Sequence, residues 1–161
     1  MRNCARRVCT LLLLGGSTIA QEKSACSLPD CDQAKAFFQQ FQQAMNEDKR
    51  QDAASLVSYP LKSYRHGKAT IISNKSQLFA KYDSVFDAPT RCAIRHAGED
   101  DVWGNWRGFT VAQGVIWWDR IIPRSVGTVQ LAAISKYRFG VFSVNHGGPL
   151  PKGCETATAP K

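Results

Sequence analysis

Hydrophobic and polar positions follow two different periods along the chain. Over residues 34–45, apolar side chains recur every three or four positions while glutamines occupy the opposite side, which predicts an amphipathic helix. Asp30 or Asp32 can cap its first turn. A second, short helix is expected from about residue 48 to residue 57, and it stops before Pro60 because the residue ahead of a proline avoids the helical region.

The second period is the alternation typical of strands. Two short strands are expected at residues 61–65 and 69–72, joined by a hairpin turn that contains Gly67. The last third of the chain is again rich in aromatic and β-branched residues. Glycines inside this block usually mark bends or bulges, so a strongly curved sheet is expected. The strands predicted there cover residues 102–106, 109–118, 128–135 and 138–144.

A third helix is predicted between the two groups of strands. It begins at Asn74, and Gln77 follows three residues later as its capping-box partner. It is expected to end at residues 87–89, where an aspartate and a proline interrupt the pattern. Residues 90–96 are expected to form one further helical turn.

The N-terminal residues have the features of a cleavable secretory signal peptide. Arg2, Arg6 and Arg7 precede an apolar run at residues 8–14, and small residues lead to an expected cleavage site after Ala20. The run is shorter than the roughly 20 apolar residues that a membrane span needs. The other interpretation, a buried N-terminal helix, lacks an amphipathic pattern. The expected organisation is a signal peptide at 1–20, a leader at 21–31, one domain at 32–146 and a flexible tail at 147–161, in a periplasmic or secreted protein.

Cleavage would change the charge balance of the chain. The full sequence has 21 Lys and Arg residues against 13 Asp and Glu residues, a net charge of +8. Three of the basic residues lie in the signal peptide, so the mature chain keeps 18 of them and a net charge of about +5. They are scattered rather than arranged in a stripe, which argues against a nucleic-acid partner.

Four cysteines remain in the mature chain, and an even number in an oxidising compartment favours two disulfides. Three pairings are possible. The favoured one joins Cys26 to Cys31 and Cys92 to Cys154, so that one bond closes a small loop and the other ties down the C-terminal tail. A metal site or a redox pair is the competing interpretation, but the sequence has no C-x-x-C and no histidine pair at ligand spacing.

Four short motifs stand out within the predicted elements. They are Leu56-Val57-Ser58-Tyr59-Pro60-Leu61, Tyr82-Asp83-Ser84-Val85-Phe86, Trp103-Gly104-Asn105-Trp106-Arg107-Gly108 and Gly114-Val115-Ile116-Trp117-Trp118. With these motifs and the order helix, short helix, two short strands, helix and a run of long strands, the sequence resembles the NTF2-like (cystatin-like cone) superfamily and small uncharacterised exported bacterial proteins within it. The resemblance covers about residues 35–145 and implies an α+β cone, with N-terminal helices packed on a curved antiparallel sheet.

Such a cone makes a pocket between its helices and the concave face of its sheet. Enzymes with this cone, of the ketosteroid isomerase type, place an acid or a His–Asp pair there and move a proton next to a carbonyl. The resemblance therefore implies an apolar ligand pocket here. The residues expected to line it are Tyr59, Tyr82, Asp83, Trp103 and Trp117.

Two residues are weak candidates for a catalytic base. Asp83 on the third helix is either a pocket carboxylate made basic by burial or a surface aspartate, and the second interpretation is favoured. His96 lies beside a loop, and neither His96 nor His66 nor His146 has a carboxylate at a suggestive sequence spacing. The sequence has no G-x-S-x-G, P-loop or G-x-G-x-x-G motif, so no catalytic residue, metal or cofactor is predicted.

The tryptophans indicate a surface for a partner. Adjacent strand residues point to opposite faces, so Trp117 and Trp118 lie on different sides of the sheet. Trp117 is expected on the helix side and Trp118 on the open face, where large aromatics are typical of a protein interface. In the family that the chain resembles, this face often pairs two copies. The predicted surface, for a homodimer or an exported protein partner, comprises Trp106, Trp118, Arg120 and Arg124.

These observations predict an exported, non-catalytic binding or interaction protein with a small apolar pocket. The first alternative is a cone-fold enzyme of the isomerase, dehydratase or cyclase type that uses Asp83 or a histidine as its base. The second is an inhibitor or immunity-type protein of another exported protein. It would need a stiff exposed loop, and residues 120–127 around Pro123 are the best candidate.

Overall fold

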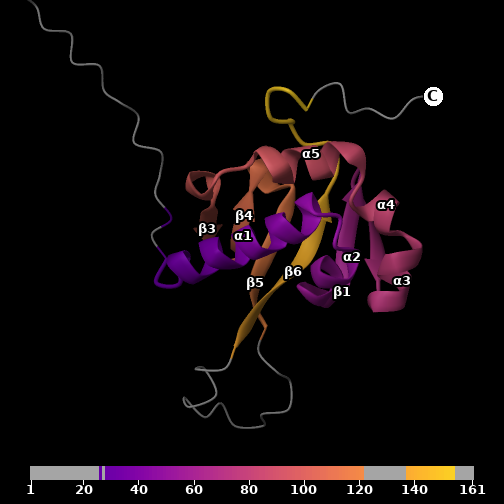
Figure 1. The fold of residues 1–161 in the computed structure, drawn as a ribbon, viewed down its shortest axis with the longest axis horizontal. Coiled ribbons are helices and arrows are strands. Elements are labelled where there is room, and N and C mark those ends of the chain that lie inside the picture. The colour runs from indigo at the N-terminus through magenta and orange to yellow at the C-terminus, as the bar shows by residue number, and fades with distance from the viewer. Residues whose placement is uncertain (1–25, 27, 122–136, 155–161) are drawn as a thin grey trace, which may run out of the picture.

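The computed structural model describes residue 26, residues 28–121 and residues 137–154 (Figure 1). Some of the regions considered above fall outside this part of the chain. They are the predicted signal peptide, most of the leader, the strand expected at 128–135, most of the loop around Pro123, Arg124 and the last seven residues of the tail. Among the described helices, none combines the length and the apolar character that crossing a membrane requires.

The helix predicted from the first apolar period is the longest in the described chain. It packs its buried phenylalanines Phe37, Phe38 and Phe41 against the sheet, and Figure 1 shows it crossing one face of the sheet. Burial of each such side chain stabilises the fold by about 1.5–3 kcal/mol. The helices are α1 (Cys31–Asn46), α2 (Arg50–Ser55), α3 (Lys75–Ala80), α4 (Tyr82–Val85) and α5 (Ala88–His96), with 3-10 turns η1 (Glu99–Asp101) and η2 (Ala112–Gly114).

The third predicted helix is divided into α3 and α4 at Lys81. The predicted cap is present, because the Asn74 side chain accepts a hydrogen bond of 2.9 Å from the backbone N–H of Gln77. Asp87, which was expected to end this helix, instead caps the next one. Its side chain accepts a hydrogen bond of 3.0 Å from the backbone N–H of Thr90 in α5.

Within the described residues, six strands form one mixed sheet in the order β2-β1-β6-β5-β4-β3. The α+β class and the helix-covered sheet agree with the sequence, but the expectation of a wholly antiparallel sheet is wrong, since β1 and β6 are parallel. The pattern of side chains along a strand sets its faces and not its direction, which depends on how the chain returns to the sheet. The strands are β1 (Val57–Arg65), β2 (Lys68–Ile72), β3 (Trp103–Asn105), β4 (Gly108–Val111), β5 (Ile116–Ile121) and β6 (Arg138–Asn145).

The strand expected at residues 109–118 is interrupted. Ala112, Gln113 and Gly114 have positive φ angles of 48°, 57° and 95° and form the turn η2 between β4 and β5. A further register shift falls between Trp117 and Trp118. Both features bend the sheet, and the second adds Phe142 to β6, since Trp117 pairs with Ser143 and Trp118 pairs with Val141.

Cross-strand partners share a face, so the register separates the two sides of the sheet. The face covered by α1 contains Phe109, Trp118, Val141 and Val57, which are paired side by side and buried. The opposite face contains one row across all six strands. That row runs Trp103, Thr110, Trp117, Ser143, Lys62 and Ile71.

The placement of Trp118 on an open partner face is therefore wrong. Trp118 has no exposed surface, and its ring stacks on Phe38 with centroids 5.6 Å apart and planes 14° from parallel. Its cross-strand partners Phe109 and Val141 share this buried face. The core around Trp118 is filled by further aromatic rings, including Phe41, Tyr82 and Phe86.

Both favoured disulfides are present, Cys26–Cys31 and Cys92–Cys154. The second joins α5 to the C-terminal segment across a sequence separation of 62 residues. Residues 147–154 of the predicted tail are thereby attached to the helical layer, and Cys154 is buried.

Candidate functional site

The ligand pocket expected between the helices and the sheet is not assembled. Tyr82 is buried in the core, where its hydroxyl donates to Met45 Sδ at 3.2 Å, and burial raises the pKa of Tyr82 to about 12. Tyr59 lies elsewhere and donates to the carbonyl oxygen of Ala54 at 3.2 Å. Trp103 and Trp117 contact each other on the opposite face of the sheet, with centroids 6.3 Å apart and planes at 81°. The sheet itself separates the expected pocket residues.

Asp83 is a surface carboxylate held by two arginines. Its oxygens accept from both terminal nitrogens of Arg50 at 3.1 Å and from Arg91 at 2.9 Å. Hydrogen bonds from Arg91 and Arg50 lower the pKa of Asp83, so it is a poorer base than an ordinary aspartate. This arrangement agrees with the surface interpretation of Asp83 and not with a catalytic one.

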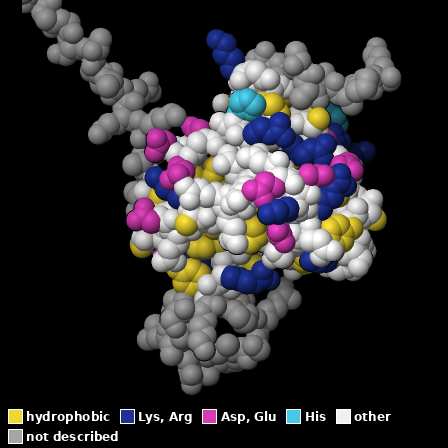
Figure 2. All heavy atoms as spheres, in the orientation of Figure 1, with side chains coloured by type: hydrophobic (Ala, Val, Ile, Leu, Met, Phe, Trp, Pro, Cys, Tyr) yellow, Lys and Arg dark blue, Asp and Glu magenta, His cyan; other side chains and the backbone are white. Residues whose placement is uncertain are grey.

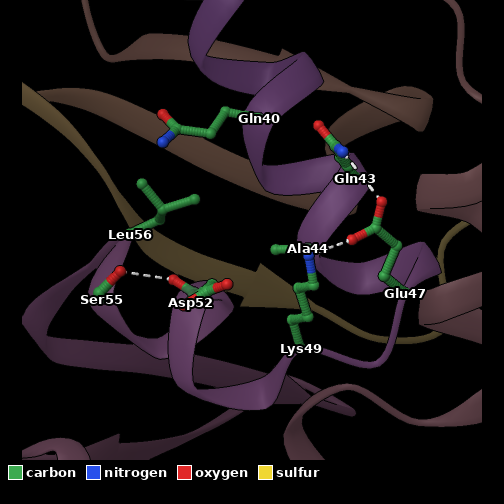
Figure 3. A pocket seen from close by; sticks show the side chains of 8 residues that line it. All are labelled: Gln40, Gln43, Ala44, Glu47, Lys49, Asp52, Ser55 and Leu56. Atoms are coloured by element: carbon green, nitrogen blue, oxygen red, sulfur yellow. Dashed lines mark hydrogen bonds and ion pairs between the residues drawn. The ribbon is translucent and has the colours of Figure 1, made fainter.

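A polar groove lies between α1 and α2 (Figure 3), with a volume of about 260 Å³. Its side chains bond mainly to their own neighbours. Lys49 pairs with Glu47 at 2.6 Å, and Gln43 donates to Glu47 at 2.9 Å. Such a groove has few convergent polar groups left for a ligand.

The most exposed large apolar side chain in the described chain belongs to Trp106, at 84%. It lies with Arg107 in the two-residue turn between β3 and β4. The Asn105 side chain accepts from the backbone N–H of Arg107 at 2.7 Å, and Gly108 closes the turn with a φ of 121°. We call residues 105–108 the tip, and these bonds hold its backbone in one conformation.

Trp106 and Arg107 form a pair on this tip. The Arg107 guanidinium lies over the Trp106 ring at 4.7 Å from its centroid. Among the described residues, no carboxylate forms an ion pair with Arg107. An exposed aromatic ring beside an available guanidinium is the combination that carries most of the energy in protein interfaces.

A recess of about 210 Å³ lies beside the tip and brings together two residues predicted for the partner surface, Trp106 and Arg120. Arg120 bonds to Asp30 at 2.6 Å and lies 3.9 Å from Asp119, so it is fixed at the rim. The recess, which we call the tip pocket, is lined by Leu28, Pro29, Asp30, Asn105, Trp106, Gly108, Phe109, Asp119 and Arg120.

A cluster that the sequence did not reveal surrounds His146. Its Nε2 lies 3.0 Å from Ser63 Oγ, and its Nδ1 lies 3.1 Å from Asp87 Oδ2. Arg65 donates to the same carboxylate oxygen at 2.9 Å. These groups come from β1, from the residue after β6 and from the N-cap of α5, which are far apart in sequence, so no spacing rule could have found them.

The connectivity of Ser63, His146 and Asp87 matches that of a hydrolase triad, but their exposure is reversed. In a hydrolase, the serine and the histidine face the substrate and the aspartate is buried behind them. Here the side chains of Asp87 and Arg65 are 23% and 50% exposed, while that of His146 is only 3% exposed and Ser63 is 7% exposed. The groups needed for attack point into the protein, so the cluster stabilises the fold by joining α5 to the sheet.

The Asp87 carboxylate is the charged centre of this cluster. Burial alone would raise its pKa, yet hydrogen bonds from His146, Thr90 and Arg65 outweigh burial and hold the pKa of Asp87 well below its ordinary value. Asp87 therefore stays ionised to a lower pH in the folded state than in the unfolded state, and its ionised form stabilises the fold. This stabilisation is complete above the ordinary pKa of about 4 and is lost as the pH falls toward the lowered pKa.

We expect Asp87→Asn to lower the free energy of unfolding by about 1.5–3 kcal/mol at pH 7, because bonds to a charged group are lost. Urea unfolding of the protein and the variant at pH 7, 5 and 3 would show the difference shrinking below about pH 4, as Asp87 becomes protonated in the unfolded state. Asp83→Asn serves as the control, since that carboxylate is 63% exposed and should have a much smaller effect. A difference that stays constant over this pH range would contradict the role of the Asp87 charge.

Comparison with known proteins gave no family: no family model, curated protein or solved structure matches the chain.

Proposed function

We propose that this chain is an exported, non-catalytic protein that binds a partner protein through the tip. The observation that carries the proposal is Trp106, a large ring that is 84% exposed on a turn fixed by Asn105 and Gly108. A turn of this kind needs no tryptophan, because its conformation depends on its neighbours. Contact between the exposed ring and water is unfavourable in the unbound protein, and a binding partner would bury the ring.

The chemistry of the tip defines the partner. The Trp106 ring fits an apolar pocket, and Arg107, which has no ion pair among the described residues, fits a carboxylate at its edge. Without residues 1–20 the chain has a net charge of about +5, which favours approach to an acidic surface. The partner is therefore a protein with an apolar pocket bordered by acidic residues.

Two further features support this proposal over an enzyme. Aromatic rings fill the space between α1 and the sheet, where a cone-fold enzyme would hold its substrate. The histidine–carboxylate pair, His146 and Asp87, has its reactive side turned inward. The proposal keeps a stiff exposed loop as the binding element, as in an inhibitor, but places it at residues 105–108.

We also propose that the chain is exported and has the NTF2-like cone. Two disulfides fit an oxidising compartment, and the six-stranded mixed sheet with helices across one face is compatible with such a cone. N-terminal sequencing of the protein from cells would test export directly. A mature chain that begins at residue 21 is expected, and an N-terminus at residue 1 would contradict cleavage.

The binding proposal predicts a specific result at residue 106. A photo-crosslinking phenylalanine analogue at this position should link the chain to one protein in the cells that express it. With that protein purified, Trp106→Ala should weaken binding by about 30-fold or more, as expected for a loss of 2 kcal/mol at a hot spot. Arg107→Glu should also weaken binding, with a slower association rate.

The control is Ile71→Ala, which removes another exposed apolar side chain at the far edge of the sheet and should leave affinity unchanged. A crosslink between two copies of the chain would show a homodimer instead and would contradict the proposed partner. An affinity unaffected by Trp106→Ala, or the absence of any crosslink from position 106, would overturn the proposal.

A further inference from the structure

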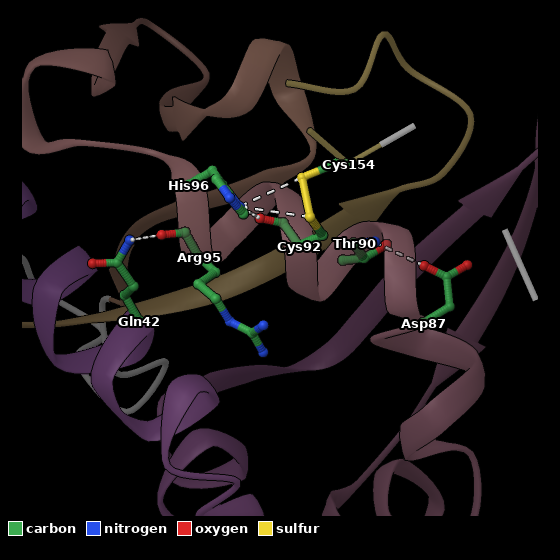
Figure 4. Close-up of a disulfide and its surroundings, with 7 residues drawn as sticks. All are labelled: Gln42, Asp87, Thr90, Cys92, Arg95, His96 and Cys154. Carbon is green, nitrogen blue, oxygen red and sulfur yellow. Dashed lines mark hydrogen bonds between the residues drawn. A yellow bond between two sulfur atoms is a disulfide. The ribbon is translucent and has the colours of Figure 1, made fainter. Parts of the chain in front are cut away.

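We propose that Cys92, His96 and Cys154 bind one transition-metal ion of the zinc class when their disulfide is reduced. Figure 4 shows the His96 ring directed at the two sulfur atoms, and Nδ1 lies 3.6 Å from Cys92 Sγ and 3.5 Å from Cys154 Sγ. The three candidate ligand atoms all lie within 4.8 Å of one another. This site is separate from the tip and does not depend on the proposed binding function.

The distances to the histidine already suit a tetrahedral ion. With Zn–S bonds of about 2.3 Å and Zn–N bonds of about 2.0–2.1 Å, sulfur and nitrogen ligands of one ion lie about 3.6 Å apart. Both nitrogen-to-sulfur distances here are close to that value. Only the two sulfur atoms must separate, because two thiolates on the same ion lie about 3.8 Å apart.

The local fold allows this separation. Cys92 and His96 lie one turn apart on the same side of α5, so the helix fixes two of the ligands. Cys154 comes from the C-terminal segment, where its backbone N–H bonds to the carbonyl oxygen of Pro151 at 3.0 Å. Movement of this segment can open the sulfur pair without moving the sheet.

A recess of about 240 Å³ borders the site on the side of His96. His96, Ala97 and Pro151 are among the residues that line it and neither cysteine is, so a water molecule there would reach the ion from the His96 side. The Arg95 side chain points away from the sulfur atoms in Figure 4, so its charge is not directed at the ion. Two thiolates, one imidazole and one open position are typical of zinc sites that bind an exogenous ligand.

The chemistry balances with a thiol reductant. Two reductant thiols are oxidised to one disulfide, while the Cys92–Cys154 bond gains two electrons and two protons and becomes two thiols. On metal binding each thiol releases its proton to solvent. His96 Nδ1, which lies 3.0 Å from the carbonyl oxygen of Cys92, gives up that hydrogen bond and carries its proton on Nε2 instead.

The test uses the full mature chain with Cys26→Ser and Cys31→Ser, so that only one cysteine pair remains. After reduction with a phosphine, which becomes the phosphine oxide, Zn²⁺ affinity is measured by competition with a chromophoric chelator under nitrogen. Co²⁺ then reports the ligands through its thiolate charge-transfer band. We expect one ion per reduced chain and none for the oxidised chain.

Variants assign the ligands. Cys154→Ser should abolish tight binding, and His96→Ala should weaken it by about 10-fold or more, because one of three protein ligands is lost. His66→Ala is the matched control, since His66 is also exposed but lies in the β1–β2 turn. Absence of binding to the reduced chain, or equal affinity of His96→Ala and His66→Ala, would overturn the proposal.

Circular dichroism shows whether the reduced chain is still folded. If reduction unfolds the protein, Zn²⁺ should restore its helical signal, and it should do so less effectively in His96→Ala. Recovery that does not depend on His96, or no recovery at all, would equally contradict the site.

Discussion

Replacing Trp118 with alanine is expected to lower the free energy of unfolding by about 3–5 kcal/mol, the range for loss of a large buried aromatic side chain. Trp118 has no exposed surface and stacks between Phe38, at 5.6 Å, and Phe109, at 6.3 Å. Its removal leaves a cavity where α1 meets the sheet. Urea unfolding followed by circular dichroism would measure the loss.

The neighbouring tryptophan provides the control. Trp117→Ala deletes the same side chain from the other face of the sheet, where it is only partly buried, and should cost about 1–2 kcal/mol. Equal losses at the two positions would mean that the assignment of faces is wrong. For the same reason Trp118→Glu should unfold the protein rather than separate a dimer, since it places a charge in the core.

Trp118→Phe is expected to lower the free energy of unfolding less than Trp118→Ala does. The indole N–H of Trp118 is buried and has no hydrogen-bond partner among the described residues. A buried donor without a partner costs about 1–3 kcal/mol, and phenylalanine removes that donor while it fills most of the space. A loss in Trp118→Phe equal to that in Trp118→Ala would contradict this expectation.

Gly108→Ala is the second substitution with a large expected effect, a loss of about 2–4 kcal/mol. Gly108 has a φ of 121°, and an added Cβ would lie 2.6 Å from the carbonyl oxygen of Trp118. Backbone strain and the clash both oppose the folded state, and relief of the clash would displace the tip. The variant should therefore lose stability and also bind the proposed partner less tightly, which unfolding and affinity measurements test separately.

Gly147→Ala separates these two causes. Gly147 also has a positive φ, 83°, but an added Cβ meets no atom within 4 Å. It should cost only about 1 kcal/mol, the conformational part of the effect. If both glycine variants lost the same stability, the close approach between Gly108 and β5 would have no energetic consequence.

The helices could be predicted because they depend on short-range patterns, and the disulfides because four cysteines allow only three pairings. The apolar spacing from Ala34 to Met45 determines which side of α1 is buried, and the Asn74 cap follows from residues three apart. Loop size favoured one of the three possible cysteine pairings, and the structure contains that pairing. These features need no knowledge of which strands are neighbours.

The candidate sites were less predictable. The sequence predicted that Trp106 faces outward. Its position on a fixed turn beside the tip pocket became apparent only from the fold. The cluster of Ser63, His146 and Asp87 joins residues separated by 83 and 59 positions. The His96 side chain was weighed as a base, whereas the fold places it against a disulfide.

By itself, the sequence determined the helical segments and the hairpin at Gly67, because each depends on residues within about one turn of each other. The even number of cysteines in the mature chain likewise indicated two disulfides. Only the tertiary structure decided that β1 and β6 run parallel and that Trp118 rather than Trp117 faces α1. The physical reason is that alternation along a strand repeats every two residues. Alternation places Trp117 and Trp118 on opposite faces, but it does not say which face the helices cover. That depends on contacts such as Trp118 with Phe38 of α1, which are distant in sequence.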